Sequence, residues 1–120
     1  MVNREEFAEP SAQHGLPDRM FKDRLSLFAG SDAIELHHFG AAHTNGDAFV
    51  VFRALRVMHA GDTFPGPNPV RRDGGSAEAY PATMSRAVAI LSGVDVVIPG
   101  HGAVATWQDF VDNVNAMNKR

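Results

Sequence analysis

Residues 40–47 read Gly-Ala-Ala-His-Thr-Asn-Gly-Asp, and residues 59–64, after an apolar run, read His-Ala-Gly-Asp-Thr-Phe. His43 and Asp62 therefore each stand at a glycine-marked turn beside a run of strand-forming residues. A third turn of the same design comes later, where residues 98–102 read Ile-Pro-Gly-His-Gly. Catalytic metal sites are commonly built in this way, with ligands on loops that rigid strands position. Together the three turns indicate a metal site more strongly than one histidine beside a glycine would.

The composition is that of an ordinary soluble globular domain. The chain has 120 residues, of which 44% are hydrophobic and 21% charged, enough for one domain with a core but short for two. Lys plus Arg number 11 and Asp plus Glu 14, so the net charge is 11 − 14 = −3 with histidine neutral. This balance lacks the clustered basic excess that nucleic-acid binding needs. The chain has no cysteine, so any metal must be held by histidines and carboxylates.

Nothing in the sequence predicts a membrane segment or secretion. No run approaches the roughly 18 apolar residues of a membrane span. The beginning of the chain, residues 1–6, lacks the apolar core of a signal peptide. We therefore expect a cytoplasmic protein whose partners include neither nucleic acid nor a membrane.

The first half of the chain predicts strands. We interpret residues 1–24 as an irregular lead-in, with a short helix near Glu5 left open, because they are polar and broken by Pro10, Gly15 and Pro17. The domain itself then occupies residues 25–120. Residues 25–29 and 33–39 have strand-like patterns around a polar turn, which predicts a hairpin. Residues 47–53 contain the run Phe49-Val50-Val51-Phe52, which is apolar on both faces and typical of a strand buried on both sides.

Residues 56–59 predict a further short strand that ends at Gly61-Asp62. A long loop rich in proline and glycine follows over residues 65–75, and the sequence leaves open whether it folds over Asp62 or is plain surface. The same loop carries two arginines that either meet an anionic substrate or are simply solvated, Arg71 and Arg72.

The second half predicts helix, strand and helix. The first helix should begin near Pro81 and end at Gly93, with an apolar stripe of Met84, Val88 and Leu91. Residues 94–98 are rich in β-branched side chains and predict a buried strand. Thr106 and Asp109 have the spacing of a capping box that opens a last helix, whose stripe is Phe110, Val114 and Met117. Four strands, a helix, a strand and a helix predict an α/β layer arrangement.

His43, Asp62 and His101 are the candidate metal ligands. Catalytic zinc commonly takes three nitrogen or oxygen ligands from the protein and keeps one position for water. Two histidines and one carboxylate also suit iron, and manganese remains open, so the residue types alone do not decide the metal. Asp47 is expected to support the His43 loop by hydrogen bonding rather than to bind metal. His38 and His59 lie on strands, which favours packing or surface roles. Thr44 and Thr63 either turn a hydroxyl toward a ligand or cap their turns.

Residues from about Asp18 to Met117 resemble the C-terminal half of the metallo-β-lactamase superfamily. The resemblance rests on three motifs in this order, Ala42-His43-Thr44-Asn45-Gly46-Asp47, Ala60-Gly61-Asp62-Thr63-Phe64 and Ile98-Pro99-Gly100-His101-Gly102. It implies a four-layer αββα sandwich, of which this chain is one β-α half, and metal-dependent hydrolysis. It also implies that His43 matches the last ligand of a first metal site, Asp62 the carboxylate that bridges two metals, and His101 a ligand of the second.

The chain departs from this family because the N-terminal motif His-x-His-x-Asp-His is absent. The adjacent pair His37-His38 has neither its spacing nor its position. We therefore predict that one chain holds at most one metal weakly, and that a second copy or a missing N-terminal half covers the exposed sheet in a homodimer or higher assembly. Two hypotheses follow: a metallo-hydrolase completed by that second chain and acting on a small molecule, or a non-catalytic, self-associating half-domain with relic ligands. A mononuclear iron protein is a weaker third.

Overall fold

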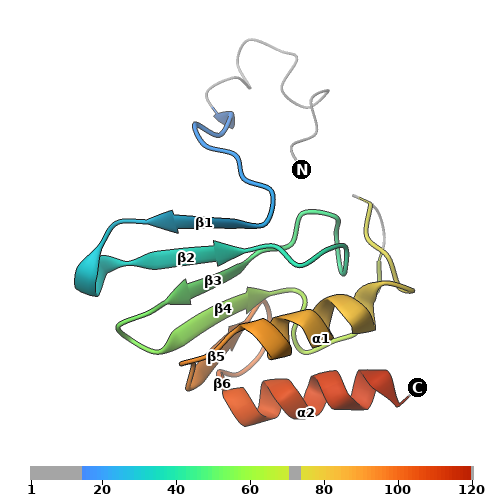
Figure 1. The fold of residues 1–120 in the computed structure, drawn as a ribbon. Helices are drawn as coiled ribbons and strands as arrows, with labels where there is room; N and C mark the ends of the chain where they lie inside the picture. Colours follow the sequence, from blue (N-terminus) through green and yellow to red (C-terminus); the bar gives the residue numbers. More distant parts are fainter. Residues whose placement is uncertain (1–14, 71–73, 120) are drawn as a thin grey trace.

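The computed structural model describes residues 15–70 and 74–119, and Figure 1 shows a single sheet with both helices on one of its faces. The expected helix near Glu5 and the loop arginines Arg71 and Arg72 lie outside the described residues. The strands are β1 (Arg24–Leu27), β2 (Ile34–His37), β3 (Phe49–Phe52), β4 (Val57–Gly61), β5 (Val96–Pro99) and β6 (Ala105–Thr106). The helices are α1 (Tyr80–Ile90) and α2 (Trp107–Asn118). None of the described helices is both long enough and apolar enough to cross a membrane.

The sheet has six strands in the order β1-β2-β3-β4-β5-β6. All neighbours are antiparallel except β4 and β5, which are parallel and joined through α1. The predicted hairpin of β1 and β2 is confirmed, with Leu25 opposite Leu36 and a short 3-10 turn (Gly30–Asp32) between the strands. The sequence did not predict β6, because two residues are too few to show a strand pattern. The predicted α/β arrangement is confirmed.

The core lies between the sheet and the two helices. Alternate strand residues point into it, so that Phe49, Val51, Met58 and Val97 are almost completely buried. Phe110 of α2 anchors the other side, with ring centres 6.2 Å from Phe49 and 5.5 Å from Phe64. The predicted stripes are confirmed except at Val88, which is half-buried: Met84, Leu91, Phe110, Val114 and Met117 are buried. Burying one such large side chain stabilises the fold by about 2 kcal/mol.

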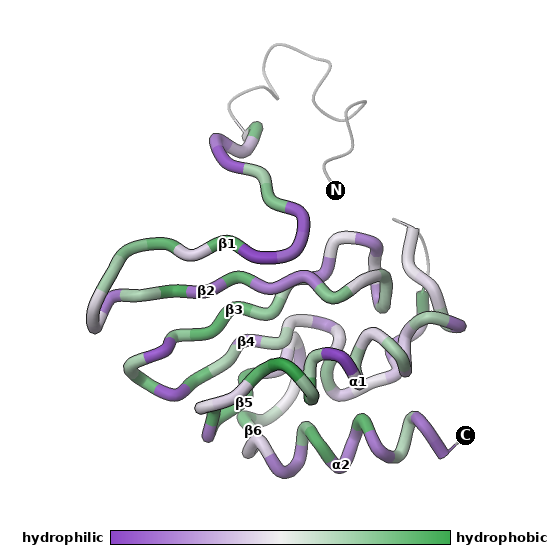
Figure 2. Tube along the Cα trace, in the orientation of Figure 1, coloured by the Kyte–Doolittle hydropathy of each residue, from purple (hydrophilic) through white to green (hydrophobic). Residues whose placement is uncertain are grey.

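The opposite face of the sheet is apolar and is covered by no element that the structure describes. We call it the open face. Strand register places on it the half-buried side chains at alternate positions of the central strands, which are apolar except for His59: Ile34, Leu36, Val50, Phe52, Val57, His59, Val96 and Ile98. In Figure 2 the central strands are mainly green, the colour of hydrophobic residues. The expectation that β3 is buried on both sides is therefore wrong for this chain alone, because the helices lie on one face only.

The beginnings of both helices agree with the prediction, and the end of α1 does not. The capping box of α2 is confirmed, since Asp109 N donates to Thr106 Oγ1 at 3.1 Å and Thr106 N donates to Asp109 Oδ2 at 2.8 Å. Helix α1 begins at Tyr80, directly before Pro81, where a missing backbone N–H costs little. The predicted end at Gly93 is wrong, because the helix stops at Ile90 with Leu91 as its C-cap; Gly93 instead forms a left-handed turn two residues later, with φ of 69°.

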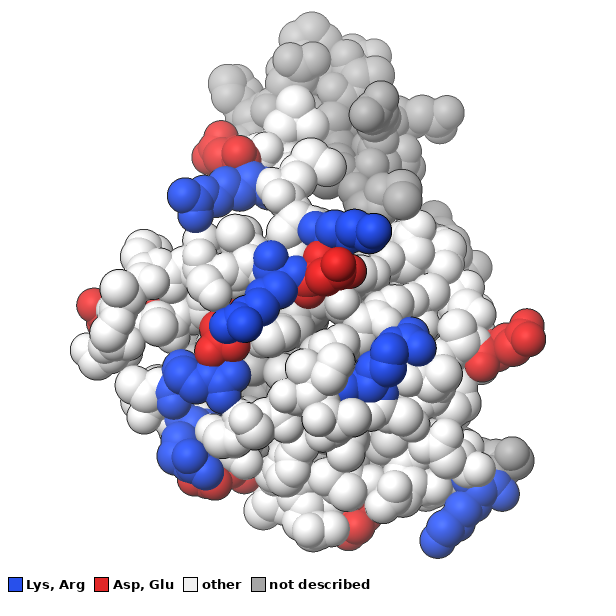
Figure 3. Space-filling view, in the orientation of Figure 1, with Lys and Arg blue, Asp and Glu red and all other residues white. Residues whose placement is uncertain are grey.

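Glu35 holds β1, β2 and β3 together from the helix-covered side. Its carboxylate accepts hydrogen bonds from Arg53 at 2.5 and 3.0 Å, from Arg24 at 3.1 Å, and faces His37 Nε2 at 3.0 Å. Arg53 also donates to the carbonyl oxygen of Ser92, which ties this network to the segment after α1. The arginine hydrogen bonds lower the pKa of Glu35 to about 2. Figure 3 shows that basic and acidic side chains lie next to one another on this face, without an extended field of one sign.

Candidate metal centre

The three predicted ligand residues lie at one end of the sheet. Asp62 directly follows β4, and His101 follows β5 by two residues. Because β4 and β5 are parallel neighbours, their carboxyl ends meet at the same edge. His43 reaches the same edge from the loop between β2 and β3, since β2 runs in the direction that brings its carboxyl end there. The topology thus gathers residues that are up to 58 positions apart, 101 − 43.

Asp62 lies between the two histidines. Its Oδ2 is 3.5 Å from His43 Nε2, and its Oδ1 is 3.2 Å from His101 Nε2. The side chain of His43 is 26% exposed, that of Asp62 41% and that of His101 87%, so the cluster opens toward solvent on the His101 side. The structure therefore brings together all three side chains that the sequence singled out.

The donor chemistry of this cluster fits a metal, but the side chains do not form a finished cage. Each carboxylate oxygen of Asp62 faces a different imidazole, as expected of a carboxylate that binds metal between two histidine ligands. Still, no group of three or more His, Cys, Asp or Glu side chains in the described part of the chain is placed to hold a metal ion as it stands. His43 Nδ1 is also buried without a hydrogen-bond partner, whereas a ligating histidine usually donates that N–H to a neighbour.

Gly100 makes room for the Asp62 carboxylate. A Cβ added at this position would overlap Asp62 Oδ1 and come within 2.9 Å of the Asp62 backbone nitrogen. The Gly100 N–H donates to the Gly61 carbonyl oxygen at 2.8 Å, which fixes the two turns side by side. The glycine is therefore part of the site because only a residue without a side chain lets the two turns approach so closely.

The His43 loop is held by hydrogen bonds from its own residues and from α1. Asp47 accepts from the Thr44 backbone N–H and from the Thr44 hydroxyl, both at 2.8 Å. The supporting role predicted for Asp47 is thus confirmed, and Thr44 caps its turn. Thr83 of α1 donates its hydroxyl to the Ala41 carbonyl oxygen at 2.7 Å. These contacts fix the backbone on both sides of His43.

Tyr80 and Asn68 hold the Asp62 turn, and neither was singled out by the sequence. The Tyr80 hydroxyl donates to the Thr63 carbonyl oxygen at 2.9 Å, and Asn68 Nδ2 donates to the Asp62 carbonyl oxygen at 2.5 Å. Burial raises the pKa of Tyr80, which keeps its hydroxyl protonated and able to donate. Thr63 donates to the Ala60 carbonyl oxygen at 2.6 Å and so caps its turn. A tyrosine at a helix start and an asparagine in a loop carry no pattern that predicts such contacts.

The described parts of the long loop pack against the cluster's backbone. Asn68 contacts the Asp62 turn, and a Cβ added at Gly75 would overlap the His43 carbonyl oxygen. Of the two alternatives that the sequence left open, the loop therefore packs onto the site rather than standing apart as plain surface. The remaining strand histidines have other partners, since His38 Nδ1 lies 2.8 Å from the Asp47 carbonyl oxygen and His59 Nδ1 accepts from the Gly61 N–H at 3.1 Å.

Comparisons with known proteins address the fold. No protein-family model matches the sequence, and no curated protein matches it either. Solved structures do match in three dimensions. A metallo-β-lactamase from Pontibacter korlensis has a TM-score of 0.72 at 19% identity, over 95% of this chain and 54% of its own. TMB-1 matches with a TM-score of 0.67 at 18% identity, over 89% of this chain and 51% of its own. DIM-1 metallo-β-lactamase matches with a TM-score of 0.65 at 18% identity, over 82% and 46%.

The chain thus spans about half the length of the solved structures that it matches. Identities of 18 to 19% support a shared fold and no more. The mixed sheet and its two helices on one face are consistent with that likeness. The chain has the fold of a partial metallo-β-lactamase domain.

Proposed function

We propose that this chain is one half of a metal-dependent hydrolase that acts on a small molecule in the cytoplasm, and that a second chain or a missing N-terminal half completes it. The observation that carries the proposal is Asp62, whose two oxygens each face a histidine nitrogen at 3.2 and 3.5 Å. The open face supports the requirement for a second partner, because an apolar sheet surface of this extent is normally covered.

Each residue has a defined part in this proposal. His43 and His101 would hold the metal through Nε2, and Asp62 would hold it through its carboxylate. Zinc is the expected metal, and when bound it lowers the pKa of a water ligand toward ~7 and supplies hydroxide at neutral pH. Gly100, Asp47 and Tyr80 position the ligands through the contacts described above. The exposed side of His101 is the direction from which a substrate and the remaining ligands would arrive.

The test is the zinc content of the purified chain, measured together with its mass in solution. We expect about one zinc per chain in a defined oligomer, and at least a tenfold loss of zinc affinity in His43→Ala and in His101→Ala. His59→Ala is the matched control, because His59 lies on β4 with its side chain on the open face, and its Nδ1 accepts from the Gly61 N–H instead of facing Asp62. Esters, lactams and phosphodiesters should then be screened with the loaded protein.

The alternative is a non-catalytic half-domain that keeps the ligands as relics. Two observations favour this alternative. His43 Nδ1 is buried without a hydrogen-bond partner, and no three potential ligands among the described residues are placed to bind one metal ion. A chain that takes up no zinc, iron or manganese at millimolar supply, yet assembles into a defined oligomer, would establish this alternative. Iron in place of zinc would establish the third reading, a mononuclear iron protein.

A further inference from the structure

Residues 39–42 connect β2 to the loop that carries His43, and we call them the connector. Strand β2 ends at His37, so its ladder hydrogen bonds stop before the connector. The carbonyl oxygens of the connector accept instead from α1 and from the segment that leads into it. Ser76 N donates to the Ala42 carbonyl oxygen at 3.0 Å, and two side chains of α1 donate to earlier carbonyl oxygens. The position of the His43 loop therefore depends on α1 as well as on the sheet.

The two side chains of α1 that reach the connector are Arg86 and Thr83. Arg86 donates to the Phe39 carbonyl oxygen from Nε at 2.9 Å and from Nη2 at 2.7 Å. The Thr83 hydroxyl donates to the Ala41 carbonyl oxygen at 2.7 Å and accepts from Arg86 Nη2 at 3.2 Å. A guanidinium is always charged and donates two hydrogen bonds from one rigid fork, so its contacts are stronger than those of neutral donors. The guanidinium, the hydroxyl and the carbonyl groups form one connected chain, in which each hydrogen bond strengthens the next.

Gly40 makes room for this arrangement. Its φ is 129°, and a Cβ added there would come within 2.7 Å of Arg86 Nη2 and 3.0 Å of Thr83 Oγ1. The guanidinium thus lies directly against the backbone of the connector, where a side chain would leave no space for it. Gly40 therefore has the same kind of role for α1 that Gly100 has for the Asp62 carboxylate.

The imidazole of His43 is not held through its own ring nitrogens. Its Nδ1 is buried without a hydrogen-bond partner among the described residues, although a ligating histidine is usually oriented through that nitrogen. Its Nε2 lies 3.5 Å from Asp62 Oδ2, which is longer than a hydrogen bond. The place of this imidazole is therefore set by the backbone that carries it.

We propose that Arg86 and Thr83 are positioning residues for His43, because they fix the connector from which the imidazole extends toward Asp62. The inference rests on the proposed function, in which His43 is a metal ligand. Loss of either side chain of α1 should weaken the metal site through His43 alone. The turns that carry Asp62 and His101 are hydrogen-bonded to one another and should stay in place.

The experiment uses the full chain and zinc alone as the probe. Arg86→Gln and Thr83→Val remove the donors at little change of size. Each should weaken zinc binding by roughly tenfold or more in titrations against a chromophoric chelator, as is typical when a group that orients a ligand is lost. Thr83→Ser keeps the hydroxyl, so it should restore an affinity within about twofold of the wild type.

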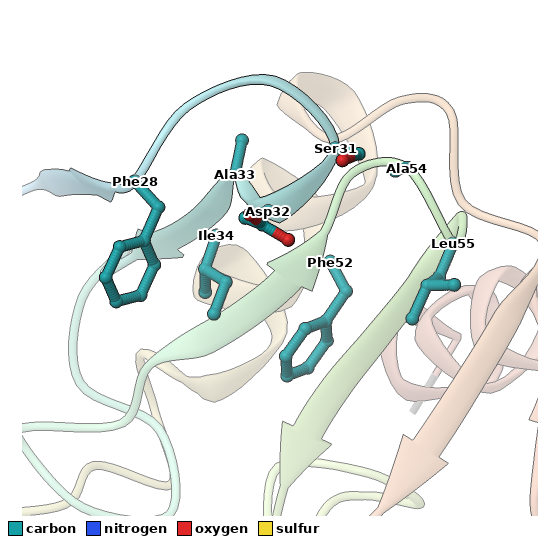
Figure 4. Close-up of a pocket in the computed structure, with 8 residues that line it drawn as sticks. All are labelled: Phe28, Ser31, Asp32, Ala33, Ile34, Phe52, Ala54 and Leu55. Carbon is teal, nitrogen blue, oxygen red and sulfur yellow. The ribbon is translucent and has the colours of Figure 1, made fainter.

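Arg56→Gln is the matched control. Arg56 donates two hydrogen bonds to Asp95 at 2.7 and 3.0 Å, a fork like that of Arg86. It lies in the β3–β4 turn at the other end of the sheet, beside the pocket that Phe52 and Leu55 line in Figure 4. Its zinc affinity should stay within about twofold of the wild type. Thermal unfolding of both arginine variants separates a general loss of stability from a specific loss of zinc affinity.

A second readout needs no metal. NMR relaxation of the His43 Cδ2–H group in the zinc-free chain measures how rigidly the imidazole is held. The ring should gain mobility in Arg86→Gln and in Thr83→Val, and it should keep its wild-type relaxation in Arg56→Gln. The ring of His101 should be unchanged in all three variants.

The two readouts separate this inference from the proposed function. A wild-type chain that binds no zinc, but whose His43 ring is loosened by Arg86→Gln, removes the hydrolase and leaves the positioning role standing. A chain that binds zinc equally well with and without Arg86 does the reverse. A His43 ring that is equally rigid in the wild type, Arg86→Gln and Thr83→Val would also overturn the inference.

Discussion

At the scale of single residues, Gly100 is the position where the smallest change should have the largest effect on the site. Gly100→Ala adds a methyl group where Asp62 Oδ1 now lies, so the carboxylate must move away from both histidines. We expect at least a tenfold weaker affinity for zinc and a loss of about 1–3 kcal/mol of stability from overpacking. Isothermal titration with zinc and thermal unfolding measure the two effects.

Gly102→Ala is the control for this substitution. Gly102 has φ of 98°, so alanine strains the backbone there, but a Cβ would meet nothing within 4 Å. It should lower stability while leaving zinc affinity within about twofold. Equal zinc affinities in the two variants would contradict the role assigned to Gly100.

Glu35 gives a prediction about acid stability. Its pKa is about 2 in the folded chain against 4.5 for the free side chain, so folding favours the ionised form. The stabilisation is therefore complete above about pH 4.5, and it is lost as the pH falls from there toward 2. After a discount for solvent screening it amounts to about 2 kcal/mol.

Glu35→Gln should remove the stabilisation that comes from the ionised carboxylate. We expect the variant to be less stable than the wild type by about 2 kcal/mol at pH 7, and the difference to shrink steadily between pH 4.5 and 2. Urea unfolding at a series of pH values measures the free energy of unfolding of both proteins. The contributions of the other carboxylates cancel in the difference because both proteins carry them. A difference that stays constant over this range would show that the arginine contacts do not set the pKa of Glu35.

At the scale of elements, the sequence predicted what depends on local pattern. The helical spacing of Phe110, Val114 and Met117 indicates burial on one face, and the structure agrees. Phe49–Phe52 is apolar at every position and predicted burial on both faces, whereas the helices cover only one. The motif turns likewise predicted which three side chains meet. Hydrogen bonds from Tyr80, Asn68 and Thr83 hold the backbone of these turns. They join residues 6 to 42 positions apart, and the periodicity of the sequence does not predict such pairs.

Asn113 is another contact of this kind and yields a prediction for the loop. Its amide side chain accepts from Gly66 N–H at 2.9 Å and donates to the Gly66 carbonyl oxygen at 2.8 Å, which fastens the proline-rich loop to α2. Asn113→Ala removes both hydrogen bonds and should cost about 1–2 kcal/mol. Amide hydrogen exchange should speed up at least tenfold at Gly66 and Asn68.

Gln108→Ala on the same helix serves for comparison. The Gln108 side chain donates to Asp112 at 2.8 Å on the exposed side of α2 and has no other side-chain hydrogen bond among the described residues, so its loss should leave the loop amides protected. If exchange at Gly66 were the same in both variants, the loop would have to be fastened by other contacts.

At the scale of the whole molecule, the helices cover one face of the sheet and no described element covers the other. The helices bury the core side, while the open face exposes apolar side chains that strand register aligns across β2 to β5. The sequence anticipated this asymmetry, since residues of β3 are apolar at every position although only alternate ones reach the helix-covered core. Whether a second polypeptide covers the open face depends on contacts between chains, and the periodicity of a single sequence does not describe such contacts.

This asymmetry predicts that stability depends on protein concentration. If a second copy covers the open face, unfolding also dissociates the dimer, and the midpoint temperature should rise by about 3 °C for each tenfold increase in chain concentration. Val50→Asp places a charge at the centre of the open face, opposite Leu36 and His59. The variant should be monomeric, and its midpoint should not vary with concentration.

Ala89→Asp provides the comparison, because Ala89 is exposed on α1 and lies away from the open face. It should keep both the dimer mass and the concentration dependence of the wild type. Differential scanning calorimetry measures the midpoint temperature at chain concentrations from about 10 to about 1,000 micromolar, the range in which weak dimers form. A wild-type midpoint that is constant over this range would mean that the open face is not covered by a copy of this chain, and a separate N-terminal half would then be the partner to seek.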